Sequence, residues 1–236
     1  MSNIRLFYSE SLSLNLTATL NKSQSHYVSK VMRVKENEVF CLFNSSGEWE
    51  AKILNISKNI VEFNVKKQLR KKDNIKELWL AFSPIKSKYF NFMIQKATEL
   101  GVTRFIPIIF ERTIVRKINK ERLEKIIIEA TEQSNRINIP TLEKPQNLKN
   151  FLSNNSKKID LVFTDLNTPK KKLEVSKDGN KPLCAVVGPE GDFSEKEREL
   201  ILNFKSVKSI NINQNILRAE TATISIISII SYILSL

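Results

Sequence analysis

Apolar residues follow two different periods along the chain, and the first one occupies roughly the first 70 residues. Short runs rich in strand-forming residues lie at 39–43, 48–54 and 60–65. The first two runs flank residues 44–47, Asn-Ser-Ser-Gly, which is a strong signal for a turn between paired strands. The pattern predicts a small β-rich domain that contains a hairpin.

Two segments around these runs have other patterns. Residues 25–33 carry apolar side chains at 27, 28, 31 and 32, which predicts a short amphipathic helix with Lys30 and Arg33 on its polar side. The charged cluster at 66–73 interrupts the apolar pattern. We therefore expect it to link the small domain to the rest of the chain.

From about residue 75 the apolar runs alternate with helical patterns. Strands are predicted at 77–82, 103–109, 160–164, 183–187 and 207–212, and helices at 88–100, 119–136, 194–203 and 220–234. This alternation predicts an α/β domain with a mainly parallel sheet covered on both faces. Ser194 and Glu197 form a capping-box pattern that sets the start of one helix. The tract at 167–181, rich in Lys, is expected to be a mobile surface loop.

The net charge of +13, from 38 Lys and Arg against 25 Asp and Glu, adds a class of partner. Such an excess favours nucleic acid first and an anionic membrane second. Abundant Lys, Asn and Ile with only five Gly also indicate a compositional bias, which would raise the Lys count without any partner. Charge alone therefore favours nucleic-acid binding without establishing it.

No membrane contact is expected. The C-terminal run at 222–236 is very apolar but shorter than the ~20 residues that a membrane span needs. Serines recur at helical spacing within it, which predicts a helix in a core or a subunit interface. The first 20 residues lack a secretory signal pattern, and the two cysteines fit reduced thiols. We expect a cytoplasmic protein.

Several common chemistries lack their motifs in this sequence. Neither G-x-G-x-x-G nor a Walker A lysine motif is present, which disfavours dinucleotide binding and NTP hydrolysis. The cysteines, Cys41 and Cys184, are far apart, and His26 is the single histidine, so no metal site is expected. Cys184 lies within an apolar strand, where its thiol should be protonated and unreactive.

Two loops near the C-terminus remain as candidates for a ligand site. Gly188-Pro189-Glu190-Gly191 follows one predicted strand, and residues 216–222 lead into the last helix. In α/β proteins ligands bind outside the carboxyl ends of the strands. Arg218 is unfavourable near the positive end of a helix dipole, so an anionic ligand or the nearby Glu220 must stabilise it. Local helix-start effects explain Glu220 and Thr221 equally well.

Six ordered motifs in this chain form a known combination. They lie at 26–35, 95–102, 111–113, 132–140, 187–191 and 216–222. Together they closely resemble the bacterial small-subunit ribosomal RNA uridine-N3 methyltransferases of the SPOUT class, over nearly the whole chain. The resemblance implies a PUA-like RNA-binding β-barrel domain at 1–72 and a SPOUT α/β methyltransferase domain at 73–236. Within the latter, residues from roughly 160 to 236 would form a trefoil knot.

The same resemblance implies the reaction and its partners. The methyl donor would be S-adenosylmethionine, and the substrate N3 of a uridine in 16S ribosomal RNA, with the assembled small subunit as the expected form. The enzyme would be a homodimer without a metal. A SPOUT enzyme with another target, such as a ribose 2'-hydroxyl or a transfer RNA, and a non-catalytic RNA-binding relative are the alternatives.

Residues are carried over from the family position by position. The cofactor would be held by Thr164, Gly188, Pro189, Glu190, Gly191, Ile212, Leu217 and Thr221. RNA phosphate would be contacted by Arg5, Lys30, Arg33, Lys86 and Arg112. Arg218 would stabilise the anionic uracil ring, with Glu220 orienting it, and the uridine would have to be unpaired or flipped out.

The sequence departs from the family pattern at two places. Asp192 stands where glycine is expected, and Asn213-Gln214-Asn215 replaces a stretch that usually begins with glycine and ends in arginine. Asp192 also adds negative charge where a sulfonium would bind. The shape of both loops therefore has to come from the structure.

Overall fold

A computed structural model describes residues 4–72, 75–168, 173 and 181–235. The chain divides into two compact units, one of residues 1–74 with 131–139 and the other of residues 75–130 with 140–236. The predicted boundary at residue 72 lies close to the first of these divisions, whereas the assignment of 131–139 was not anticipated. Most of the loop expected at 167–181 lies outside the described residues.

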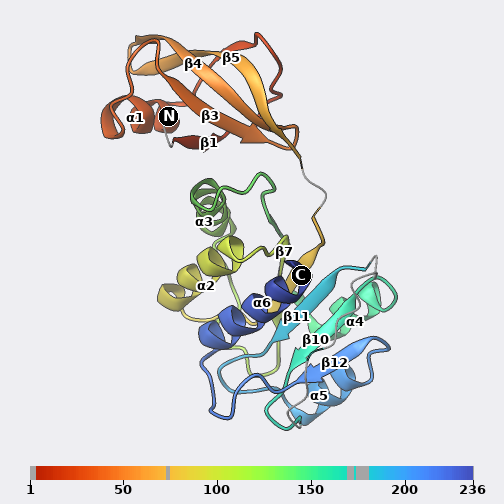
Figure 1. Ribbon diagram of the computed structural model, residues 1–236. Helices are drawn as coiled ribbons and strands as arrows, with labels where there is room; N and C mark the ends of the chain where they lie inside the picture. Colours follow the sequence, from red (N-terminus) through yellow and green to blue (C-terminus); the bar gives the residue numbers. More distant parts are fainter. Residues whose placement is uncertain (1–3, 73–74, 169–172, 174–180, 236) are drawn as a thin grey trace. The chain divides into compact units, whose positions relative to one another are not determined.

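Unit 1 is built on a five-stranded sheet (Figure 1). Its order is β1 (Arg5–Phe7), β3 (Val39–Asn44), β4 (Gly47–Ser57), β5 (Ile60–Lys71) and β2 (Thr17–Thr19). β1 pairs with β3 in parallel, and the remaining pairs are antiparallel. The predicted hairpin is confirmed, with β3 and β4 joined by a tight turn at residues 44–47.

The linker predicted at 66–73 is wrong for residues 66–71, which continue β5. Opposite charges on the neighbouring strand make this possible. Lys67 lies opposite Glu50, 3.6 Å from Nζ to Oε1, and Arg70 lies opposite Glu48 and forms an ion pair with it. Cross-strand pairs of opposite charge stabilise a sheet, so a run of basic residues can remain a strand.

The predicted helix at 25–33 begins earlier and changes its type. α1 (Lys22–His26) starts at Asn21, whose side chain accepts a hydrogen bond from Gln24 N, and Tyr27–Val31 continues as one π-helical turn. Asn is a favoured residue at this capping position. Lys30 and Arg33 are exposed at the end of this helical segment.

Unit 2 contains a seven-stranded sheet in which every pairing is parallel, as predicted. Its strands in order are β12 (Val207–Ile210), β10 (Asp160–Thr164), β11 (Leu183–Val187), β6 (Leu78–Phe82), β7 (Arg104–Ile109) and β8 (Thr141–Leu142), with β9 (Gln146–Asn147) also paired to β7. The two shortest strands, β8 and β9, were not predicted.

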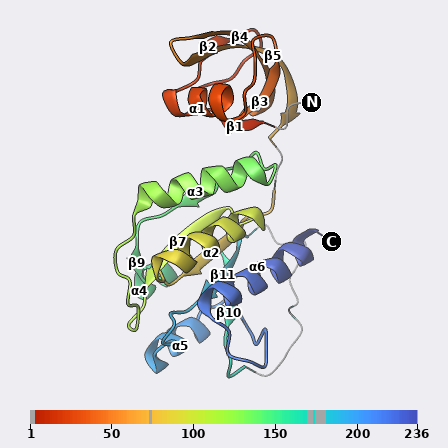
Figure 2. The same cartoon turned by 90° about the vertical axis from the view of Figure 1, so that its left-hand side faces the viewer.

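Helices cover both faces of this sheet (Figure 2). α2 (Ser87–Glu99) packs with α6 (Ala219–Ser235), and Phe90 of α2 contacts the ring of Phe82. On the other face, α4 (Leu148–Asn155) and α5 (Glu195–Leu202) share a buried cluster with Trp79 and Ala81. α3 (Lys120–Gln133) begins in unit 2, and its last residues are grouped with unit 1.

The apolar C-terminal run forms α6. Ile226, Ile227 and Ile230 are fully buried in unit 2, while the serines that alternate with them are half-buried. Across the described ranges, no helix combines the length and apolarity of a membrane span. The expectation that this run packs within the protein is therefore met by α6.

Candidate functional site

A cleft of about 660 Å³ opens at the carboxyl ends of β10, β11 and β12. It is lined by Tyr89 of α2, residues 164–166 after β10, residues 187–193 after β11, and most of residues 210–222, which lead from β12 into the first turn of α6. Its volume is within the range of pockets that bind small molecules and cofactors. The predicted ligand loops thus meet at the edge of the sheet where parallel α/β proteins bind ligands.

Most of the residues predicted to hold a cofactor line this cleft. They are Thr164, Gly188, Pro189, Glu190, Gly191, Ile212 and Leu217, together with Arg218 and Glu220. Thr221 is absent from the lining and is exposed on the first turn of α6. Its neighbours Glu220 and Ala222 face the cleft, and successive helical side chains are about 100° apart, so Thr221 points elsewhere.

Aromatic packing beneath the first loop explains Gly188. A Cβ atom at Gly188 would lie 2.5 Å from the ring of Phe193. Phe193 in turn packs edge-on against Phe110 and Phe163, at centroid distances of 5.1 and 5.0 Å. Only glycine leaves room for this ring, so the loop after β11 is anchored by the core below it.

The aspartate that replaces an expected glycine adopts a glycine-like conformation. Asp192 has φ +63°, and its Oδ1 accepts a hydrogen bond of 2.8 Å from Phe193 N. Aspartate is among the residues that tolerate this left-handed region. The substitution therefore leaves the turn in place and adds a carboxylate to the cleft lining.

The helix after this loop begins where the sequence predicts. Both hydrogen bonds of a capping box are present. Glu197 N donates to Ser194 Oγ, and Ser194 N donates to Glu197 Oε2. Glu197 Oε1 also accepts from Glu111 N at 2.8 Å. One buried carboxylate thus fixes the start of α5 and the residue just before Arg112.

The second departure from the family pattern, at 213–215, is stabilised by asparagine side chains. Asn213 N donates to Asn211 Oδ1 at 3.1 Å, and Asn215 N donates to Asn213 Oδ1 at 2.9 Å. Asparagine readily forms such local turns. Two consecutive turns carry the chain from β12 to α6 without the expected glycine.

Arg218 is exposed immediately before α6, and its guanidinium lies 5.8 Å from the ring centre of Tyr89. Tyr89 is on α2 and also lines the cleft, a role that no motif in the sequence indicates. Among the described residues, no ion pair joins Arg218 to Glu220. The orienting role of Glu220 stays a prediction, and Tyr89 is the residue in contact with the guanidinium.

The cleft is acidic, although the protein is basic. Its lining contains four carboxylates, from Asp165, Glu190, Asp192 and Glu220, and one guanidinium, from Arg218. Asp165 and Asp192 also form ion pairs with Arg198 behind the lining, so the site keeps an excess of two negative charges. A cluster of one sign of charge within a concave site attracts ligands of the opposite sign. The cleft therefore suits a ligand that carries positive charge.

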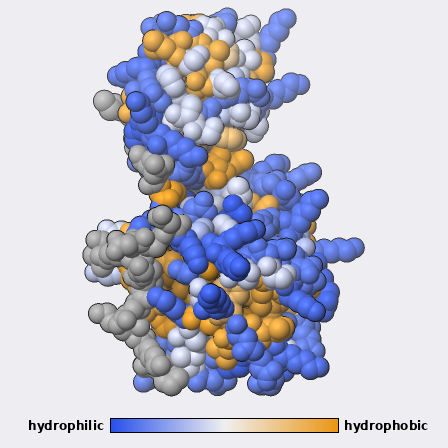
Figure 3. Space-filling model, turned by 90° about the vertical axis from the view of Figure 1, so that its right-hand side faces the viewer, coloured by the Kyte–Doolittle hydropathy of each residue, from blue (hydrophilic) through white to orange (hydrophobic). Residues whose placement is uncertain are grey.

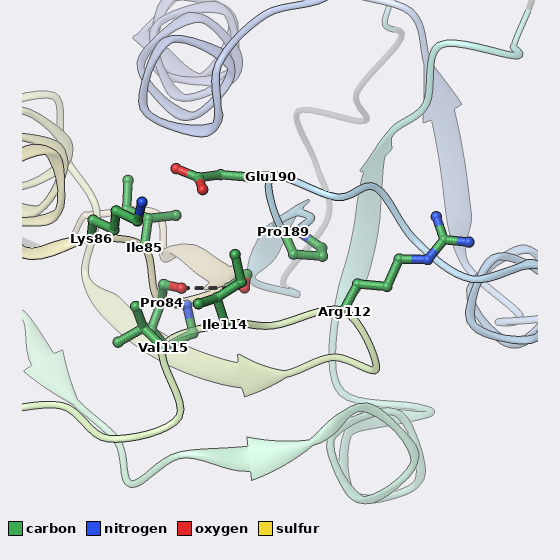
Figure 4. A pocket seen from close by; sticks show the side chains of 9 residues that line it. Pro84, Ile85, Lys86, Arg112, Ile114, Val115, Pro189 and Glu190 are labelled. Atoms are coloured by element: carbon green, nitrogen blue, oxygen red, sulfur yellow. Dashed lines mark hydrogen bonds between the residues drawn. The ribbon is translucent and has the colours of Figure 1, made fainter.

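A small cavity of about 10 Å³, the size of one water molecule, adjoins the cleft through Pro189 and Glu190 (Figure 4). Lys86 and Arg112, both predicted to contact RNA, line it together. In Figure 4 the Arg112 guanidinium points away from Lys86, and its Nη1 donates to Gly191 O at 2.8 Å. Arg112 thus supports the loop after β11 while remaining exposed.

Arg5 differs from the other predicted RNA-binding residues because its side chain is buried, with 10% exposed. Its Nε pairs with Glu48 at 2.6 Å, and its other nitrogens donate to the carbonyls of Thr131, Glu132 and Arg136. All three nitrogens are bonded within the protein, so a contact with phosphate would compete with the bonds that hold residues 131–139 in unit 1.

Neither Cys184 nor His26 lines the cleft. Cys184 is fully buried in β11, and burial raises the pKa of its thiol far above its ordinary value, which keeps it protonated. His26 is exposed on unit 1. Within the described part of the chain, no group of three or more potential metal-ligating side chains occurs.

Two family models match this chain. The model of an RNA methyltransferase domain matches residues 71–231, and the model of an RNA methyltransferase PUA domain matches residues 20–66. A curated relative from Rickettsia conorii, ribosomal RNA small subunit methyltransferase E, is 39% identical over 86% of this chain and 84% of its own length.

Solved structures give the same result. A ribosomal RNA small subunit methyltransferase E from Neisseria gonorrhoeae, bound to S-adenosyl methionine, has a TM-score of 0.83 and 27% identity, covering 98% of this chain and 97% of its own. A methyltransferase from Legionella pneumophila, in complex with the cofactor SAM, has a TM-score of 0.85 and 26% identity, with coverages of 99% and 98%.

Proposed function

This chain belongs to the ribosomal RNA small subunit methyltransferase E family, and on that basis we propose that it transfers a methyl group from S-adenosylmethionine to N3 of a uridine in 16S ribosomal RNA. The observation that carries the proposal is the cleft at the ends of β10, β11 and β12, which is acidic within a chain of net charge +13. The basic surface suits RNA, whereas the cleft suits a cationic cofactor.

The residues of the cleft fit S-adenosylmethionine chemically. The cofactor carries a sulfonium and an ammonium group, which the carboxylates of Glu190, Asp192 and Glu220 favour. Its apolar surfaces suit Leu166, Ile212 and Leu217. The loop at 188–191 lets backbone approach the ligand closely, because two of its four residues are glycine. These residues would hold the cofactor, which supplies an electrophilic methyl group when bound.

Arg218 would contribute most to the transfer step. Uracil N3 reacts after it loses a proton, and a guanidinium beside the ring stabilises the resulting negative charge. Arg218 is exposed where it lines the cleft, and its guanidinium lies 5.8 Å from the ring centre of Tyr89, so its donors can reach a bound base. Holding the cofactor and the uracil ring together in the cleft would lower the activation barrier further through proximity.

Exposed cations on each unit would contact RNA phosphate. Lys30 and Arg33 lie on unit 1, and Lys86 and Arg112 lie beside the cleft in unit 2. On the face shown in Figure 3, hydrophilic residues cover much of the surface, with apolar residues between them. We assign phosphate contacts to these four residues and a structural role to Arg5. The assembled small subunit in the bacterial cytoplasm is the proposed substrate.

The finer features of the fold belong to the same proposal. We infer a PUA-like barrel for residues 1–72, a methyltransferase domain for 73–236, and a knot within 160–236 that threads α6. Half-buried Ile224, Ile229 and Ile233 on α6 suit a second copy of the chain, so we propose a homodimer. Analytical ultracentrifugation at micromolar concentration tests this, and a monomer would contradict it.

The test of the reaction is nucleoside mapping by mass spectrometry. Small subunits that lack the modification, free 16S RNA and transfer RNA are each incubated with the protein and S-adenosylmethionine, then digested. We expect 3-methyluridine in RNA from the small subunits. A ribose 2'-O-methyl product or methylated transfer RNA would identify another target, and cofactor binding without any transfer would indicate a non-catalytic relative.

A further inference from the structure

Arg198 is a nearly buried arginine that lies behind the cleft and is absent from its lining. It belongs to α5, and 11% of its side chain is exposed. Its guanidinium nonetheless contacts carboxylates from two separate loops that do line the cleft, those of Asp165 and Asp192. No sequence motif distinguishes it from the other charged residues of α5.

The first partner organises the loop after β10. Arg198 Nη1 is 2.6 Å from Asp165 Oδ1, and only 4% of the Asp165 side chain is exposed. The same carboxylate accepts from Asn167 N at 3.0 Å and from Thr168 Oγ1 at 3.1 Å. The side-chain amide of Asn167 also lies against the guanidinium, with its oxygen accepting from both Nη atoms in the orientation that satisfies both groups.

The second partner belongs to the loop after β11. Arg198 Nη2 is 3.7 Å from Asp192 Oδ2, and 59% of the Asp192 side chain is exposed. Asp192 N donates to Pro189 O at 3.0 Å, which closes the turn. This is the residue that occupies a left-handed position where glycine is expected. Its carboxylate is therefore available to Arg198 only because of that substitution.

We propose that Arg198 is a positioning residue that joins the two cofactor loops from behind and holds them in their binding geometry before the cofactor arrives. One rigid, planar guanidinium can bond two carboxylates at once, which a point charge does less well. A site whose loops are fixed in advance loses less freedom on binding, and small displacements of positioned groups weaken it strongly. The proposal rests on S-adenosylmethionine being the ligand of this cleft.

Loss of Arg198 would leave two carboxylates facing each other without a cation. Asp165 would remain buried with its charge unpaired, a strongly unfavourable arrangement. The loops would then separate or take up water. A purely structural role for Arg198 would lower the stability of α5 and leave the affinity for the cofactor unchanged, so the two roles are separable by experiment.

The test compares Arg198→Met and Arg198→Lys with Lys196→Met, a matched control that removes an exposed charge from the same helix. Titration calorimetry measures S-adenosylmethionine binding below the melting temperature of each variant. We expect Arg198→Met to weaken binding about 10- to 100-fold, because misplaced groups have effects of this size. The affinity of Arg198→Lys for the cofactor should lie between those of Arg198→Met and the native protein. The affinity of Lys196→Met should stay within about two-fold of the native value.

Two further measurements distinguish a positioning role of Arg198 from a purely structural one. In the cofactor-free protein, amide hydrogen exchange at residues 165–168 and 188–192 should become faster in Arg198→Met than in Lys196→Met. In methylation assays, KM for the cofactor should rise while kcat at saturation and KM for RNA stay near their native values. Unchanged affinity and exchange in a folded Arg198→Met protein would overturn the proposal.

Should Arg198→Met fail to fold, Asp192→Asn decides, because that side chain is mostly exposed and its loss leaves the buried pair intact. In the cofactor-free protein we expect faster amide hydrogen exchange at residues 165–168 and 188–192, which the loss of a direct contact between Asp192 and the cofactor would not cause. Cofactor binding should weaken by about two- to five-fold, the range for exposed ion pairs. Exchange equal to that of the native protein would contradict the joining role of Arg198. Absence of binding by the native protein would instead refute the proposed function.

Discussion

Arg5 in unit 1 and Arg218 at the cleft carry the same charged group in opposite environments. The guanidinium of Arg5 is buried and bonded to one carboxylate and three backbone carbonyls. That of Arg218 is exposed and rests on the ring of Tyr89. An arginine whose three nitrogens are all bonded within the protein holds a fold together, whereas one whose guanidinium is exposed can bind a ligand. Sequence position cannot distinguish these two cases.

The largest expected effect concerns Arg5. Arg5→Ala leaves Glu48 buried next to Arg70 alone and frees three carbonyls, so we expect a loss of about 3–5 kcal/mol in the free energy of unfolding, as for other broken buried pairs. Urea denaturation measures it. Arg33→Ala, which removes an exposed charge from the same unit, serves as the control. Unchanged stability with a specific loss of RNA affinity would restore Arg5 as an RNA-binding residue.

Arg218 should show the reverse behaviour. Arg218→Ala is expected to lower kcat about 10²- to 10³-fold, the effect of removing one stabilising donor, with stability nearly unchanged because the side chain is exposed. Arg218→Lys should retain part of the activity, since charge remains without the planar fork. Single-turnover methylation measures both. Near-normal methylation by a folded Arg218→Ala protein would remove this residue from the mechanism.

Gly188 tests whether the loop after β11, which we propose to bind the cofactor, is fixed by the core beneath it. Gly188→Ala would push a methyl group into the Phe193 ring, and we expect a loss of about 1–3 kcal/mol from overpacking. Gly191→Ala is the matched control, because its Cβ would lie 3.4 Å from Arg112 Cβ and needs little adjustment. Thermal unfolding compares the two. Equal stability of both variants would show that Phe193 does not constrain the loop.

The exposed cations of unit 1 should have the smallest effects. Lys30→Ala and Arg33→Ala are each expected to weaken RNA binding modestly and to reduce the slope of log K against log salt by about 1, as for a lost phosphate contact. Filter binding at several salt concentrations measures this. Slopes equal to that of the native protein would place the RNA elsewhere.

The elements that the sequence predicted best are those with local signals. The strands at 160–164 and 183–187 agree with β10 and β11 at both ends, and the capping box of Ser194 and Glu197 forms as expected. The predictions failed where contacts with residues distant in the sequence determine the local structure. β5 continues through a basic run because Glu48 and Glu50 face it, and Arg5 is buried by carbonyls from residues 131–136.

The predictions for the site divide in the same way, between local motifs and contacts with residues distant in the sequence. The glycine loop and the segment before α6 were predicted to form a pocket from their motifs, and both line one cleft. Tyr89 and Arg198 were not predicted, because each acts through a contact with a residue more than 30 positions away. Neither side chain belongs to a motif, so only their three-dimensional neighbours reveal them.

The most direct test of the central claim is a crystal structure of the protein with S-adenosylmethionine. The account predicts electron density for the cofactor between residues 188–192 and residues 211–222, with Arg218 free to face the substrate. Density at another place, or a cleft that remains filled by its own side chains at saturating cofactor, would contradict it.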